Sequence, residues 1–387
     1  MADDAAGPDF DLDDAALRRA GSMKWAFPPA DVLPAWIAEL DVVPCPAVTR
    51  ALHDAVDRGV VGYPPLAAAT GLPEATADFF TERFGWAIDP GTVLPTSDVM
   101  AGIMLVLRHL CEPGGVVVPV PAYPPFLAAI PYAGRELVTV PMVLSDNGCR
   151  LDLDRIEAEL ASGRARTVLI ANPHNPTGRV FTRAELESLR DVVTRHGGRV
   201  ISDEIHGPLA GSGFTPYRTL PGALEHSTSV VSVSKAWNLP GLKCAQIICA
   251  SPQEARTLYG FNHVAHHGVS SLGVVASVAA YAEGRAWLDG MVEALRERRD
   301  QLTDLLAERL PAVRHVPSEA TYLAWLDVRP TGLEGEDPTA VALRRGRVMV
   351  QDGRLFGPGY EGFVRLNFGT SAERLDRIVA GLATAWT

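Results

Sequence analysis

The sequence predicts an α/β protein whose main sheet is parallel and is covered by helices on both faces. Between residues 100 and 250, short continuous apolar runs alternate with helical stretches, which is the pattern of buried parallel strands. Beyond about residue 269 the chain turns helical and then provides two further strands, which indicates a second and smaller α+β unit. The length of 387 residues leaves room for both units.

The elements that precede the sheet are expected to be mainly helical. The first two dozen residues are acidic, and we expect them to be mobile until they dock on another part of the protein. Residues 48–84 have helical spacing, which the sequence GYPP interrupts at residues 62–65.

The strands of the main sheet are expected at apolar runs between residues 100 and 250. These runs lie at residues 116–121, 136–142, 167–173, 199–204, 228–235 and 245–250. In parallel sheets, ligands bind beyond the carboxyl ends of the strands. Polar residues at those ends are therefore the candidates for function.

The smaller unit is expected to contain a long amphipathic helix at residues 289–309 and strands at 321–328 and 363–370. We expect the N-terminal segment, residues 1–50, to join this unit. The expected division is therefore a large domain at residues 51–285 and a small domain at residues 286–387.

Composition argues against several classes of protein. The net charge of −11 argues against a nucleic-acid partner, which needs clustered Lys and Arg. The five cysteines are widely spread without a CxxC pair, which predicts neither a disulfide framework nor a zinc site. The least polar stretch, residues 269–282, is too short to span a membrane, and the acidic N-terminus does not resemble a signal peptide. We expect a soluble protein in the cytoplasm.

The run at 228–235 ends in Ser232, Ser234 and Lys235, with Lys243 eight residues later. Desolvation at a buried strand end lowers the pKa of a lysine, and a neutral amine can condense with a carbonyl. The two hydroxyls and the second cation could hold a phosphate dianion beside it. The alternative is a solvated lysine where the strand reaches the surface.

Two other strand ends carry polar groups. The run at 199–204 leads to Asp203, whose carboxylate could pair with a pyridinium N–H or could only cap a helix. The sequence ANPHNPTG at 171–178 contains two Asn-Pro pairs that fix a rigid loop. Asn175 could there donate its amide to a phenolate-type oxygen, or the loop could simply be a turn.

Arg365 interrupts the apolar alternation of the last predicted strand, FVRLNFGT at 363–370. A guanidinium in that place suits bidentate capture of a carboxylate. The alternative is a structural ion pair.

Taken in order, these motifs resemble the fold-type-I pyridoxal-phosphate enzymes of the aspartate aminotransferase superfamily. Within it, the chain is most similar to the MalY/PatB group of cystathionine β-lyases. The resemblance covers nearly the whole chain and rests on LPAWIAELD (33–41), GYPP (62–65), ANPHNPTG (171–178), SDEIH (202–206), SVSKAWNLPGLKCA (232–245) and GFVRLNFGTS (362–371). It implies a large domain with a mostly parallel seven-stranded sheet, a smaller α+β domain, pyridoxal 5′-phosphate as cofactor, and a homodimer with shared active sites.

The resemblance also implies roles around the cofactor ring. Lys235 would bind the cofactor covalently and move the substrate proton. Asp203 would pair with the pyridine nitrogen, and Asn175 would hydrogen-bond the phenolic oxygen. Tyr123 would stack on the ring and take part in catalysis, and His206 would lie under or beside the ring.

Further roles concern the phosphate and the substrate. Ser232, Ser234 and Lys243 would hold the phosphate, which Tyr63 would reach from the neighbouring subunit. Arg365 would bind the substrate carboxylate. Trp36, with the nearby Lys24 and Trp25, is expected to border the substrate entrance.

The chain departs from its relatives at two positions. Asp98 stands where relatives commonly have glycine, in the phosphate loop PTSDVMAGI at 95–103. The N–H of Val99 can still face a phosphate at a helix start, provided that Asp98 turns away to cap the helix. Pro208 stands where many relatives have an acidic residue.

The implied activity is a carbon–sulfur β-lyase that cleaves cystathionine or another S-substituted cysteine to a thiol, pyruvate and ammonia. One alternative is an aminotransferase with the same residues. Another is an enzyme of specialised metabolism that acts on a bulky cysteine conjugate, including decarboxylation coupled to deamination. A binding or regulatory protein that keeps the fold without turnover is the alternative from a different class.

Overall fold

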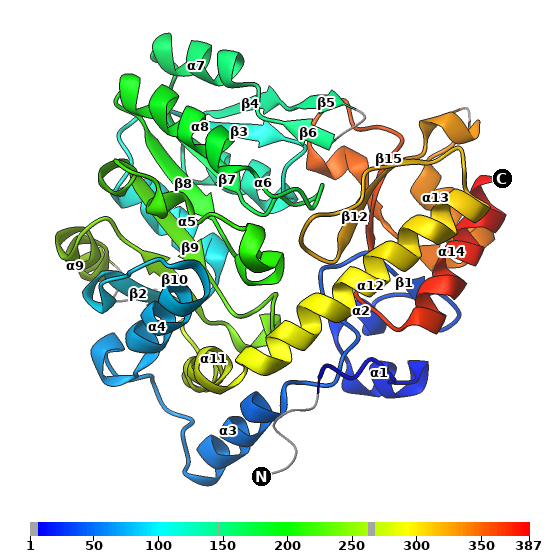
Figure 1. Cartoon of the computed structure of the whole chain (residues 1–387), viewed down its shortest axis with the longest axis horizontal. Helices are drawn as coiled ribbons and strands as arrows, with labels where there is room; N and C mark the ends of the chain where they lie inside the picture. Colours follow the sequence, from blue (N-terminus) through cyan, green and yellow to red (C-terminus); the bar gives the residue numbers. More distant parts are fainter. Residues whose placement is uncertain (1–6, 146–147, 262–267, 334) are drawn as a thin grey trace.

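A computed structural model describes residues 7–145, 148–261, 268–333 and 335–387 (Figure 1). Its main sheet has seven strands in the order β2-β10-β9-β8-β7-β3-β4. The pairs β4–β3, β3–β7, β7–β8 and β8–β9 are parallel, whereas β10 is antiparallel to both of its neighbours. The mostly parallel sheet that the sequence predicts is confirmed.

The strands of this sheet follow the predicted runs closely. They are β2 (Val93–Thr96), β3 (Gly115–Val120), β4 (Leu137–Pro141), β7 (Ala165–Ala171), β8 (Arg199–Asp203), β9 (Ser227–Val231) and β10 (Ala245–Ile248). Two differences bear on the site. The sequence did not indicate β2, and β9 ends at Val231, so Ser232, Ser234 and Lys235 lie in the turn that follows the strand rather than within it.

Helices cover both faces of the sheet. One face packs against α5 (Val99–His109), α6 (Pro124–Tyr132) and α9 (Pro252–Phe261). The other face packs against α7 (Leu153–Ala161) and α8 (Arg183–Arg195). The helices α3 (Pro46–Asp57), α4 (Leu72–Phe84) and α11 (Ser271–Glu283) gather beside the β2 edge (Figure 1).

The second sheet has four antiparallel strands in the order β11-β12-β15-β14. These are β11 (Arg314–His315), β12 (Leu323–Asp327), β15 (Phe363–Asn367) and β14 (Gln351–Asp352). The helix α12 (Arg285–Arg309) runs from α11 to the smaller unit, and α13 (Pro338–Gly346) and α14 (Ala372–Trp386) lie against the smaller sheet (Figure 1). The remaining strands form two short pairs, β1 (Leu33–Pro34) with β13 (Val348–Met349) and β5 (Val143–Ser145) with β6 (Gly148–Arg150).

From residue 7 onward the N-terminal stretch is docked on another part of the protein, and its first six residues lie outside the described residues. It forms α1 (Asp14–Ala20) and α2 (Met23–Ala26). Asp14 pairs with Arg374 at 2.8 Å and with Arg377 at 3.0 Å. One acidic residue of this stretch is therefore the partner of two basic residues on α14, which are more than 350 positions away in the sequence.

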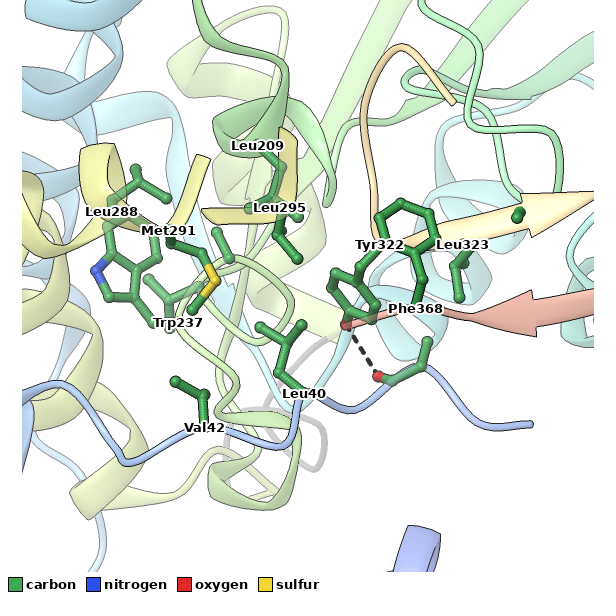
Figure 2. Packing of buried hydrophobic residues seen from close by; sticks show 14 of the residues in the cluster. Leu40, Val42, Leu209, Trp237, Leu288, Met291, Leu295, Tyr322, Leu323 and Phe368 are labelled. Carbon is green, nitrogen blue, oxygen red and sulfur yellow. Dashed lines mark hydrogen bonds between the residues drawn. The ribbon is translucent and has the colours of Figure 1, made fainter. Parts of the chain in front are cut away.

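The segment after β1 crosses between the two sheets and enters the core (Figure 2). Leu40 packs in the same cluster as Trp237, which follows β9, Met291 of α12 and Tyr322, which precedes β12. The hydroxyl of Tyr322 donates to the carbonyl of Ala38 at 3.0 Å. This packing holds the backbone of residues 37–40 in place beside the strand ends.

Among the described residues, no helix is long and apolar enough to cross a bilayer.

Candidate active site

A cavity of about 370 Å³ lies at the carboxyl ends of the parallel strands, where the smaller sheet faces the larger one. Because β10 is antiparallel, its first residue, Ala245, lies at this same edge and places Lys243 there. The lining residues are Ile37, Ala38, Glu39, Ser97, Asp98, Val99, Met100, Tyr123, Ala171, Asn175, Asp203, Ile205, His206, Ser232, Ser234, Lys235, Pro240, Lys243, Cys244 and Arg365.

Lys235 is held in this cavity rather than at the surface. Its Nζ donates to the carbonyl oxygen of Ala38 at 2.8 Å. Burial lowers the pKa of Lys235 to about 8, and the guanidinium of Arg365 acts in the same direction. A sizeable fraction of the amine is therefore neutral near physiological pH, which is the form that can attack a carbonyl or take up a proton.

Asp203 ends β8 and is 5% exposed. Its Oδ1 accepts the N–H of Ile205 at 3.1 Å, and no described residue donates to Oδ2. Burial raises the pKa of Asp203 to about 7, against the lowering effects of that N–H and of Lys235. A cationic N–H placed against Oδ2 would restore the charged form.

Arg365 reaches the cavity from β15 and is 4% exposed. It donates from Nη1 to Oδ1 of Asn175 at 3.1 Å and from Nη2 to the carbonyl of Trp36 at 2.8 Å. No carboxylate of a described residue pairs with it, and its buried Nε has no hydrogen-bond acceptor among the same residues. A structural ion pair is thereby excluded within the described chain, and burial lowers the pKa of this cation to about 10. Because Asn175 accepts through Oδ1, its Nδ2 is left to donate.

The other end of the cavity contains the start of α5. Asp98 caps this helix, because its Oδ1 accepts the N–H of Ala101 at 2.8 Å, and its Oδ2 lies 3.2 Å from Nζ of Lys243. The expected turn of Asp98 toward the helix is confirmed. The hydroxyl of Ser232 donates to the carbonyl of Cys244 at 2.8 Å and accepts the N–H of Ser234 at 3.1 Å. Ser232 therefore shapes the turn, and Ser234 is better placed to donate to a phosphate.

Tyr123 and His206 line the middle of the cavity. The ring of Tyr123 packs edge-on against Phe126 at 5.6 Å, and burial raises the pKa of its hydroxyl. His206 is 2% exposed, and burial lowers its pKa to about 3, with Lys235 and Arg365 acting in the same direction. His206 is therefore neutral, and its Nδ1 has no hydrogen-bond partner among the described residues.

The residues expected at the substrate entrance lie elsewhere. The indole of Trp36 packs on Phe27 at 5.3 Å and donates to the carbonyl of Lys24, and Trp36 is not among the residues that line the cavity, so its contact with substrate stays a prediction. The backbone carbonyl oxygen of Trp36 accepts a hydrogen bond from Arg365 and thereby orients the guanidinium in the cavity. Lys24 and Trp25 are each 1% exposed and both bind the buried Asp41.

Tyr63 also lies away from the cavity of its own chain. Its side chain is 80% exposed, on the loop between α3 and α4. Within a single chain it cannot take part in the site, which is compatible with the role expected for it in a neighbouring subunit.

Two residues of the site were not singled out from the sequence. Glu39 lines the cavity near Lys235, and its charge opposes the lowering of that lysine's pKa. Tyr322 fixes the Ala38 carbonyl that holds Lys235. The sequence could have indicated Glu39, because it is an acidic residue within the largely apolar segment 33–41. No local pattern around Tyr322 indicates its role.

The donor set fits pyridoxal phosphate. An amine with a lowered pKa, a buried carboxylate with one uncommitted oxygen, an amide donor and a helix start with a nearby cation all line one cavity. Lys235, Asp203 and Asn175 match the aldehyde, the ring nitrogen and the phenolic oxygen of that molecule, and Ser234 with the α5 N-terminus matches its phosphate.

Comparison with known proteins gives consistent results. A family model described as "Aminotransferase class I and II" matches residues 37–382. The cystathionine beta-lyase of Corynebacterium glutamicum is 36% identical, with 95% of this chain and 97% of the relative covered. Cystathionine beta-lyase PatB of Bacillus subtilis is 31% identical, with 94% and 97% covered. A crystal structure from Corynebacterium diphtheriae, of a protein provisionally named a PLP-dependent β-cystathionase, has a TM-score of 0.91 at 36% identity and covers 98% of this chain and 99% of that one.

Proposed function

The chain belongs to the class I and II aminotransferase family of pyridoxal-phosphate enzymes, and on that premise we propose that it is a carbon–sulfur β-lyase. The reaction takes an S-substituted cysteine and water, and releases a thiol, pyruvate and ammonia. The names of the relatives, cystathionine beta-lyases at 31–36% identity over nearly the full chain, support this activity.

The observation that carries the proposal is the position of Arg365. Within the described chain it is a buried cation without a carboxylate partner, in the same cavity as Lys235 and Asp203. A buried charge of this kind needs an anion, and the carboxylate of an amino-acid substrate provides one. By holding one end of the substrate, Arg365 selects which bond at the α-carbon faces Lys235.

In the proposed reaction, each ionisable side chain of this cavity has a separate role. When bound, pyridoxal phosphate supplies an electron-withdrawing ring that stabilises negative charge at the α-carbon. Asp203 would hold the ring nitrogen of that group through its uncommitted Oδ2 and favour its protonated form. The neutral amine of Lys235 takes the α-proton, and the Ala38 carbonyl holds that amine in place. Expulsion of the thiolate from the β-carbon completes the elimination, and hydrolysis of the remaining fragment gives pyruvate and ammonia.

We also propose that the enzyme is a homodimer in which Tyr63 completes the phosphate site of the partner subunit. The exposed fractions of Tyr63, Val61 and Leu66 are 80%, 79% and 63%. Three large apolar side chains exposed on one short loop are unusual on a monomer and typical of an interface.

A cytoplasmic location is part of the same proposal. All five cysteines are buried and none forms a disulfide bond within the described chain, as expected for a reducing compartment.

The proposal is tested by incubating the holoenzyme with L-cystathionine and with S-methyl-L-cysteine, and quantifying thiol and pyruvate. Equimolar thiol and pyruvate, absent from the Lys235→Ala variant, support the lyase. Formation of the amine form of the cofactor together with a keto acid, without release of thiol, would instead identify an aminotransferase. Release of carbon dioxide would identify decarboxylation coupled to deamination.

A further inference from the structure

The phosphate end of the active-site cavity contains an aspartate beside its lysine. Asp98 is the N-cap of α5, and its Oδ1 accepts the N–H of Ala101 at 2.8 Å. Its other oxygen, Oδ2, lies 3.2 Å from Nζ of Lys243. Both residues line the cavity together with Val99 and Ser234, which are expected to bind phosphate. The helix cap therefore fixes a carboxylate at the place where an anion is expected.

The charge of Asp98 acts on the interior of the cavity. Burial raises the pKa of Tyr123, and the charges of Asp203 and Asp98 act in the same direction. The side chains of Asp98 and Lys243 are 42% and 56% exposed, so solvent still reaches this end of the cavity. A ligand bound there displaces part of that water and thereby strengthens the charge interactions around it.

Lys243 is the cation nearest to the start of α5 among the described residues that line the cavity. The two other cations, Lys235 and Arg365, are held by hydrogen bonds elsewhere in it. A phosphate monoester carries about 1.5 to 2 negative charges at neutral pH, whereas Lys243 and Asp98 form a pair without net charge. The charged side chains at this end therefore provide no net positive charge to balance a phosphate.

Asp98 also uses one of the neutral donors at this end. The N–H of Ala101 is among the groups with which a helix start binds anions, and Asp98 already accepts it. The hydroxyl of Ser232 is committed to a backbone carbonyl, which leaves that of Ser234. Asp98 thus reduces both the positive charge and the number of donors that a phosphate can use.

We propose that Asp98 competes with the cofactor phosphate for Lys243 and for the start of α5, so that the covalent link to Lys235 is what retains the cofactor. Pyridoxamine phosphate, the amine form of the cofactor, cannot make that link and leaves this site easily. Elimination ends with the cofactor linked to Lys235 again, whereas transamination passes through the unlinked amine form. In this respect the inference rests on the proposed function, because the competition by Asp98 then favours elimination over transamination.

Binding of pyridoxamine phosphate to the full-length cofactor-free protein measures the competition without turnover. Titration calorimetry compares the wild type with Asp98→Asn, which keeps a good helix cap and removes the charge. The variant should bind about three- to tenfold more tightly, a modest change because water screens part of the charge of a half-exposed pair. Pyridoxamine, which lacks the phosphate, should bind equally to both proteins.

Two further variants separate the charge of Asp98 from other effects. Asp98→Gly has neither a charge nor a side-chain donor, so it should also tighten the binding of pyridoxamine phosphate. Asp152→Asn is the matched control, because Asp152 caps α7 through the N–H of Arg155 at 3.1 Å and lies 3.2 Å from Nε of that arginine. Asp152 does not line the cavity, so its replacement should leave binding unchanged.

Four results would overturn the proposal. Weaker binding by both Asp98 variants would mean that Asp98 orients Lys243 toward the phosphate. Unchanged binding in both would mean that the charge does not reach the ligand. Tighter binding in Asp98→Asn alone would assign the effect to the new amide donor, and equal tightening for pyridoxamine would place the effect away from the phosphate.

The preference for elimination is measured separately. Holoenzyme without free cofactor is given L-alanine, which has no β-leaving group, and 2-oxobutyrate. The amino group of alanine passes to the cofactor and then to 2-oxobutyrate, so pyruvate and 2-aminobutyrate form in equal amounts. Asp98→Asn should complete at least about threefold more of these turnovers per chain before activity is lost.

An equal number of turnovers in the two proteins would refute the effect of Asp98 on the choice of reaction and leave the binding result intact. Failure of the proposed function is recognised by a different result, the absence of thiol and pyruvate from cystathionine.

Discussion

Replacing Asp203 by asparagine should stabilise the protein without its cofactor, although it removes a residue proposed to be essential. Burial raises the pKa of this carboxyl from its ordinary value of 3.8 to about 7. Each pKa unit corresponds to about 1.4 kcal/mol, so keeping the charged form buried costs about 4 kcal/mol above pH 7. Asparagine avoids this cost, but its amide loses about 1–2 kcal/mol if a donor stays unsatisfied. The net gain is about 2–3 kcal/mol.

The sign of the pH dependence follows from the raised pKa of Asp203. Well below its ordinary pKa of 3.8 the carboxyl is protonated in both the folded and the unfolded chain, so its charge costs nothing. As the pH rises toward 7 the unfolded chain ionises while the folded chain does not, and the wild-type protein loses stability relative to the variant. The gain from Asp203→Asn should therefore be present at pH 8 and small or reversed at pH 4.

The assay is urea unfolding of the cofactor-free proteins at the two pH values, with Asp304→Asn on the exposed face of α12 as the control. With the cofactor bound, the wild type should instead be more stable than the variant, because a protonated ring nitrogen would stabilise the charged carboxylate of the wild type but not the amide of the variant. The quantity to compare is the free energy of unfolding of the variant minus that of the wild type. If this difference is no larger at pH 8 than at pH 4, the reasoning is refuted. In that case the inference that Asp203 is buried without a compensating charge in the cofactor-free protein would be wrong.

Three further predictions concern the site. Borohydride reduction of the holoenzyme followed by peptide mapping should place a pyridoxyl group on Lys235, and an unmodified Lys235 peptide would contradict the covalent link. Arg365→Lys should raise the KM for amino-acid substrates about 10- to 100-fold, because one ammonium cannot replace a bidentate guanidinium, with kcat less affected in steady-state assays. Tyr63→Phe should weaken cofactor affinity about tenfold, the effect of one lost hydrogen bond to a charged group, and unchanged affinity in a titration would remove the support for a shared site.

The residues proposed for chemistry were visible in the sequence because they violate local patterns. Arg365 interrupts an apolar strand, and Lys235 and Asp203 follow apolar runs that could only be buried. A charged group in such a place is costly unless it has a function or a partner, so its position is informative by itself. The same reasoning could not assign Trp36, because an indole is equally at home in a core, and here it packs on Phe27 while its carbonyl orients Arg365.

The sequence alone was sufficient for the alternation of strands and helices, for the edge of the sheet that carries the site, and for its principal ionisable groups, since these depend on periodicity and on local polarity. Tertiary structure decided what depends on contacts between distant segments. These include the docking of the acidic N-terminus on α14, the Ala38 carbonyl beside Lys235, and the buried Nε of Arg365, which lacks an acceptor among the described residues. Whether a polar atom has a partner is a property of how the chain folds back on itself, and no local pattern of residues contains it.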